Sequence, residues 1–158
     1  MRRTITALVY NRSGVLSMIT SVLNRRQVNI ESISVGVVDQ DNISRMTIVA
    51  NVESLQEAEQ VTKQLNKQID VIKVSDITEK AHIERELALV KVNAPSVSRS
   101  EIQAVIAPFR ADTVDVAQKM IVVQVVGTHE KINALIEILR PYGIVQMART
   151  GITGLTRG

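Results

Sequence analysis

The residues of this sequence best suited to hold a small ligand are Asn11, Arg12, Ser13 and Gly14, a polar run between a strand-like and a helix-like segment. A helix that begins after this run leaves free backbone N–H groups at its first turn, where the helix dipole favours an anion. Gly14 has no side chain to block a ligand carboxylate. The spacing therefore indicates a site for a small zwitterion, whose charges Asn11 and Asn29 could meet by hydrogen bonding.

A simpler interpretation of the same residues is structural. Asn11 or Ser13 would cap the helix, and Gly14 would only permit the tight turn. Helix caps are common and a single glycine is a weak signal, so these residues alone leave both interpretations open.

Catalytic motifs are absent from the sequence. It contains no cysteine, which excludes disulfides, thiolate nucleophiles and cysteine-based metal sites. The only histidines are His82 and His129, and no G-x-S-x-G, G-x-G-x-x-G or Walker motif occurs. We therefore expect no catalytic residues and no metal site in this chain.

The composition favours a globular protein that binds neither nucleic acid nor a membrane. Of 158 residues, 45% are hydrophobic, and 19 Lys and Arg are dispersed among 16 Asp and Glu for a net charge of +3. Tyr10, Phe109 and Tyr142 are too few to build an aromatic stacking platform. The first apolar run ends at Asn11 without a cleavage site, so we expect a cytoplasmic protein.

The first half of the sequence predicts the element order β-α-β-β-α-β. Alternating and helical periodicities follow one another, with turn residues between them. The expected elements are a strand over 4–10, a helix carrying Leu16, Ile19 and Leu23, strands over 30–38 and 45–51 joined by a turn at 39–42, a helix capped by Ser54 and Glu57, and a strand over 71–77.

The same order recurs after a polar stretch, so the predicted fold class is α+β, with two ferredoxin-like βαββαβ units. The predicted domains are residues 1–78 and 86–158, with a linker at 79–85. In the second domain we expect a strand over 87–92, a helix capped by Ser98 and Glu101 that ends near Pro108, strands over 113–117 and 121–126, a helix capped by Thr128, and a strand over 144–148.

Each predicted sheet has helices on one face only. The bare face, marked by Val35, Val37, Val122 and Gln124, needs a cover, and pairing of two copies would cover both the apolar surface and the open strand edges. We therefore expect a homo-oligomer.

Several segments resemble a known family. The runs 11–16 (Asn-Arg-Ser-Gly-Val-Leu) and 28–32 (Val-Asn-Ile-Glu-Ser) resemble the ACT domain, a small-molecule-sensing module that usually binds amino acids. Residues 43–48, 70–75, 84–92 and 148–158 narrow the resemblance to the small, regulatory subunits of acetolactate synthase, over essentially the whole length.

The resemblance implies a noncatalytic subunit that activates the large catalytic subunit and makes it sensitive to feedback by valine. Thiamine diphosphate, Mg and FAD would then reside in the large subunit. It also implies a homodimer of ACT domains with the effector at their interface. The residues it assigns to the effector site are Asn11, Gly14, Val15 and Leu16 on the turn side and Asn29, Ile30 and Val35 on the opposing side.

One position departs from the pattern: Gln27 stands where such modules commonly have glycine. Two other functions remain open at this point. One is a stand-alone ACT-type sensor that regulates another enzyme or a transcription factor. The other is a ferredoxin-like enzyme with a diffuse active site.

Overall fold

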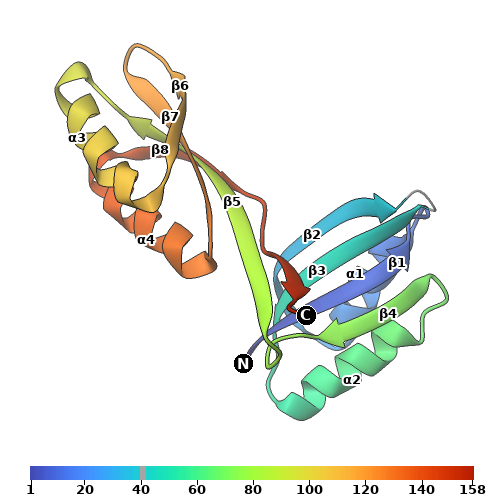
Figure 1. The fold of residues 1–158 in the computed structure, drawn as a ribbon. Coiled ribbons are helices and arrows are strands. Elements are labelled where there is room, and N and C mark those ends of the chain that lie inside the picture. The colour runs from blue at the N-terminus through green and yellow to red at the C-terminus, as the bar shows by residue number, and fades with distance from the viewer. Residues whose placement is uncertain (40–41) are drawn as a thin grey trace. The chain divides into compact units, whose positions relative to one another are not determined.

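The computed structural model describes residues 1–39 and 42–158. The chain forms two compact units, one made of Met1–Ile83 with Gly151–Gly158 and the other of Glu84–Thr150 (Figure 1). Each unit has two helices against one antiparallel sheet, which confirms the predicted α+β class and the two βαββαβ units.

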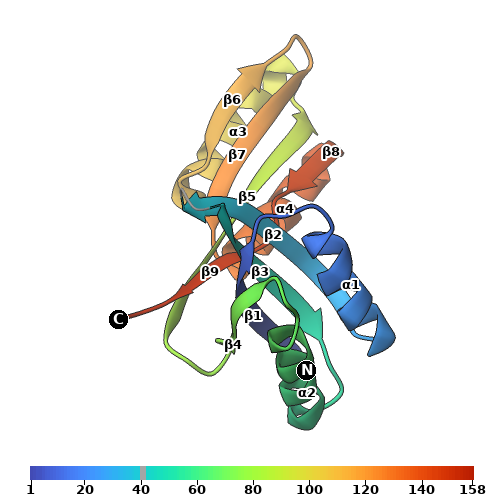
Figure 2. The same cartoon turned by 90° about the vertical axis from the view of Figure 1, so that its right-hand side faces the viewer.

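The first unit is built from β1 (Arg2–Tyr10), α1 (Val15–Arg25), β2 (Asn29–Asp39), β3 (Ile43–Asn51), α2 (Leu55–Asn66) and β4 (Val71–Asp76). Its sheet has the order β2-β3-β1-β4, so β2 and β4 are the edge strands. Both helices lie on the same side of the sheet (Figure 2), where Ile5, Ile19, Met46, Ile48 and Leu65 are fully buried. Gln40 and Asp41, in the predicted turn, lie outside the described residues.

The second unit repeats this arrangement with β5 (His82–Asn93), α3 (Ser96–Ile106), β6 (Asp112–Val116), β7 (Met120–Gly127), α4 (His129–Leu139) and β8 (Ile144–Arg149). Its strand order is β6-β7-β5-β8. A 3-10 turn, Ala107–Phe109, follows α3 at Pro108, as expected, and a second, Arg140–Tyr142, follows α4. Ile102, Ile106, Ile132, Leu135 and Leu139 fill its core.

The domain boundaries differ from those expected. β5 begins at His82, within the predicted linker, because β9 (Thr153–Thr156) pairs with it and the Arg157 N–H donates to the Ala81 carbonyl at 2.9 Å. The sequence predicts that residues 151–158, here called the tail, belong to the second domain. In the structure they belong to the first unit.

The tail lies on the face of the first sheet opposite the helices (Figure 2). The Gly154 N–H donates to Thr47 Oγ1 at 3.2 Å, and the Ile152 side chain is only 2% exposed. At Gly151, φ is +79° and a Cβ would lie 2.8 Å from the Ser32 Cβ, so a side chain would be both strained and crowded. The tail thus covers part of the sheet face that the sequence left bare.

The helix caps are in part those predicted. Ser54 Oγ accepts from the Glu57 N–H at 3.1 Å, and Thr128 Oγ1 accepts from the Lys131 N–H at 3.2 Å. The predicted Ser98 cap is wrong. Helix α3 begins at Ser96 with Pro95 as N-cap, because the extended backbone of Pro95 lets the helix start three residues earlier.

These caps give a first prediction. Thr128→Ala should lower the free energy of unfolding by about 1 kcal/mol, since a helix N–H loses its acceptor. Ser98→Ala, inside the first turn of α3, is the matched control and should change it by less than about 0.5 kcal/mol. Chemical denaturation followed by circular dichroism measures both, and equal losses would contradict the assignment of the caps.

Candidate functional site

The turn before α1 leaves the helix N-terminus without a side-chain cap. Gly14 is the N-cap residue, in the left-handed region with φ 86°, and no side chain among the described residues caps the helix. Neither Asn11 nor Ser13 therefore plays the capping role of the simpler interpretation. The N–H groups of Leu16 and Ser17, in the first helical turn, remain available to an anion.

The turn-side residues differ in how far their side chains are exposed to a ligand. Asn11 and Gly14 are exposed, and Leu16 is 49% exposed, so an apolar side chain stands beside the turn. Val15 is only 5% exposed and packs in the core, so it would take part through its backbone alone. The Arg12 side chain already has partners within the chain: its Nη1 donates to Asp70 at 2.8 Å, and its guanidinium lies 4.9 Å from the Tyr10 ring centroid.

The opposing residues lie on β2, an edge strand. Asn29 is exposed, Ile30 is half-buried against the core, and Val35 is 47% exposed. An edge strand has one row of backbone groups unpaired within its sheet, which suits it to meet another strand.

Strand register separates the two groups within one chain. Asn51 of β3 pairs with both Arg2 and Asn29, whereas Ile43, at the other end of β3, pairs with Tyr10, which directly precedes Asn11. β3 is nine residues long, so Asn11 and Asn29 lie about 26 Å apart along the sheet at about 3.3 Å per residue. One chain does not bring Asn11 and Asn29 together.

Gln27 occupies a strained position at the end of α1. Its φ is +56°, in the left-handed region, and its N–H donates to the Asn24 carbonyl at 3.0 Å. A non-glycine residue in this conformation costs roughly 1–2 kcal/mol. The geometry explains why glycine suits this position and shows that Gln27 still adopts the backbone of the turn.

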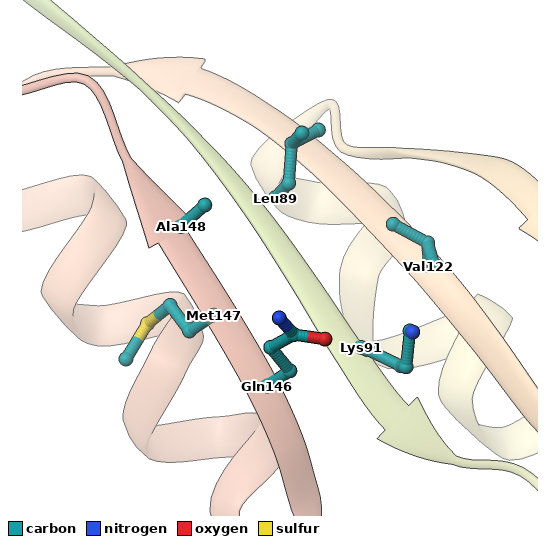
Figure 3. A pocket seen from close by; sticks show the side chains of 6 residues that line it. All are labelled: Leu89, Lys91, Val122, Gln146, Met147 and Ala148. Atoms are coloured by element: carbon teal, nitrogen blue, oxygen red, sulfur yellow. The ribbon is translucent and has the colours of Figure 1, made fainter.

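The second unit has a hollow of about 220 Å³ on its sheet, lined by Leu89 and Lys91 of β5, Val122 of β7, and Gln146, Met147 and Ala148 of β8 (Figure 3). The lining is largely aliphatic, and Lys91 supplies its one charged group. Val122 had marked this face as bare in the sequence. The hollow suits an apolar side chain rather than a charged ligand.

The described residues offer neither a metal-binding cluster nor a membrane-spanning helix. Within residues 1–39 and 42–158, no three His, Asp or Glu side chains gather into a cluster able to hold a metal ion. Over the same residues, no helix combines the length and the apolar character needed to cross a membrane.

The fold and the turn define a two-unit protein whose first unit is of the ACT type. Residues 5–73 match the family model described as the AHAS small subunit-like ACT domain. Residues 85–158 match the model described as the small subunit of acetolactate synthase.

Individual relatives agree with these matches. The chain is 54% identical over 158 residues to the acetolactate synthase small subunit of Bacillus subtilis, covering 100% of the chain and 92% of that protein. It is 43% identical over 155 residues to that of Mycolicibacterium smegmatis, covering 98% and 91%. The crystal structure of the acetolactate synthase small subunit from Thermotoga maritima superposes with a TM-score of 0.89 at 30% identity, covering 100% and 98%. This chain belongs to the family of acetolactate synthase small subunits, and the resemblance found in the sequence is confirmed.

Proposed function

We propose that this chain is a noncatalytic regulatory subunit that binds the large catalytic subunit of acetolactate synthase, raises its activity and makes it sensitive to valine. Membership in the small-subunit family supports the regulatory role and the choice of partner. Thiamine diphosphate, Mg and FAD belong to the large subunit in this proposal.

The uncapped turn at Gly14 is the observation that carries the effector site. The N–H groups of Leu16 and Ser17 would receive the valine carboxylate, and the amide oxygen of Asn11 would accept from its ammonium group. The exposed Leu16 side chain would contact the isopropyl group. These three features match the three chemical groups of an aliphatic amino acid.

The second half of the site would come from another copy of the chain. Asn29 is about 26 Å from Asn11 along the sheet, so both can contact one ligand only if two chains contribute. The exposed edge strand β2, with Val35 and Val37, offers the surface for such a homodimer. Two equivalent valine sites per dimer follow from the symmetry.

An enzyme assay tests the proposal. Acetolactate formation by the large subunit is measured without and with this chain, and across a valine titration. We expect activity to rise when the chain is added and to fall again as valine increases. A chain that binds valine but leaves the large subunit unaffected would instead be a sensor for another protein, and acetolactate formation by the chain alone would contradict the noncatalytic role.

Subunit mixing tests the shared site and gives a second prediction. Asn11→Ala and Asn29→Ala proteins should each lose most valine binding, because each lesion affects both sites of a homodimer. In the mixed dimer one site carries both lesions and the other carries neither, so about half the binding capacity should return. Calorimetry after verified subunit exchange measures it, and no recovery would argue that each site lies within one chain.

A further inference from the structure

A second hollow, in the first unit, has the chemistry of an anion site. It has a volume of about 140 Å³, smaller than the roughly 300–1,000 Å³ typical of drug-sized ligands. Its lining comes from three strands and the tail: Thr6 and Leu8 of β1, Arg45 of β3, Lys73 and Ser75 of β4, Ile77, and Thr156 of the tail.

Strand register places the two cations of this hollow on either side of one residue. Leu8 pairs with Arg45 on one neighbouring strand and with Lys73 on the other. Strands in a sheet lie about 4.8 Å apart, so the two Cα atoms are about 10 Å apart and the long side chains can converge over Leu8. In the adjacent row of the same face, Thr6 pairs with Ser75 and adds hydroxyl groups.

Within residues 1–39 and 42–158, the polar side chains that line this hollow have no hydrogen-bond partner. Among the described residues, none accepts from the Arg45 guanidinium or the Lys73 ammonium, and none is hydrogen-bonded to the Thr6 hydroxyl. Thr6 is nonetheless only 6% exposed. The Thr6 hydroxyl is not among the buried polar atoms that lack a partner in the described residues, so it remains accessible from the hollow and can donate a hydrogen bond to a ligand there.

No carboxylate of the lining neutralises the two cations, because the lining contains no Asp or Glu. Asp76, next to Ser75, accepts from Arg3 Nε at 2.8 Å. Burial raises the pKa of Asp76, but hydrogen bonds from Thr78 and Arg3 outweigh it and hold that pKa below its ordinary value. The negative charge of Asp76 is therefore committed to Arg3.

We propose that this hollow binds a doubly charged oxyanion of the phosphate type, held by Arg45 and Lys73, with the hydroxyls of Thr6, Ser75 and Thr156 as further donors. Two cations in a lining that contains no acidic side chain suit a dianion better than a single carboxylate. The volume admits a phosphate group with part of the molecule that carries it. The site is separate from the proposed valine site, which uses neither cation.

Binding at this hollow would also secure the tail. Thr156 is the last residue of β9, and it is the tail's contribution to the lining. A ligand that contacts Thr156 and the sheet at once favours the docked tail, since it binds that state better than the undocked one. Slower hydrogen exchange of the β9 amides in the presence of phosphate is the expected sign.

Inorganic phosphate is the probe for this site, added to the full chain in a buffer free of other oxyanions. Calorimetry and amide chemical shifts should show saturable binding, with shifts at Thr6, Arg45, Ser75 and Thr156. Arg45→Gln with Lys73→Gln should weaken binding at least tenfold. Lys67→Gln with Lys119→Gln removes the same charge from exposed positions elsewhere and should leave binding unchanged.

Three results would overturn the proposal: no saturable phosphate binding, equal weakening in both double variants, or succinate binding as tightly as phosphate. Thr6→Val, which keeps the side-chain shape and removes the hydroxyl, gives an independent measurement and should weaken phosphate binding severalfold. Valine affinity is measured on the same variants and should be unchanged, so failure at this hollow is distinguishable from failure of the valine site.

Discussion

A Gly14→Asp protein should remain folded and lose valine binding, with affinity falling by two to three orders of magnitude. The new carboxylate would stand where the ligand carboxylate approaches the helix N-terminus. Two like charges about 4 Å apart repel by about 4 kcal/mol at an effective dielectric constant near 20, and each 1.4 kcal/mol is tenfold in affinity. A Cβ at Gly14 meets nothing within 4 Å, so the fold has space for the substitution.

Gly14→Asn is the matched control. Asparagine has nearly the same size, and like aspartate it tolerates the left-handed conformation with φ 86°. It carries no charge, so it should weaken valine binding far less than aspartate does. Calorimetry measures both affinities, and circular dichroism checks the fold. Unchanged affinity in a folded Gly14→Asp protein would remove the turn from the effector site.

The sequence predicts those elements whose signals are local. Alternation and helical periodicity locate the strands and helices of both units, and Ser54 and Thr128 cap their helices as expected. The docking of the tail is not predictable in this way. β9 is four residues long, and the Gly154 contact to Thr47 spans 107 positions, so no local period records it.

In the candidate site, too, the features set by contiguous residues are predictable from the sequence, and those set by packing are not. The Gly14 turn is recognisable because its glycine, polar neighbours and helix are contiguous. The burial of Val15 and the distance between Asn11 and Asn29 depend on packing and strand register, which emerge only in the folded sheet. The hollow between Arg45 and Lys73 was missed for the same reason. The sequence does show one basic residue in each of the two strands, Arg45 in β3 and Lys73 in β4, but not that the two strands flank β1.

The largest expected effect on stability lies in the tail. Ile152→Ala should lower the free energy of unfolding by about 2–4 kcal/mol, because truncating a side chain that is only 2% exposed would leave a cavity where the tail is packed. Leu155→Ala, in the same segment but 54% exposed, should cost less than about 0.5 kcal/mol. Denaturant titration measures both differences. Hydrogen exchange locates the effect, which should fall on the amides of the tail and of the sheet face it covers. The two side chains differ in burial, so equal and small losses in the two variants would mean that residues 151–158 do not pack on the first unit in solution.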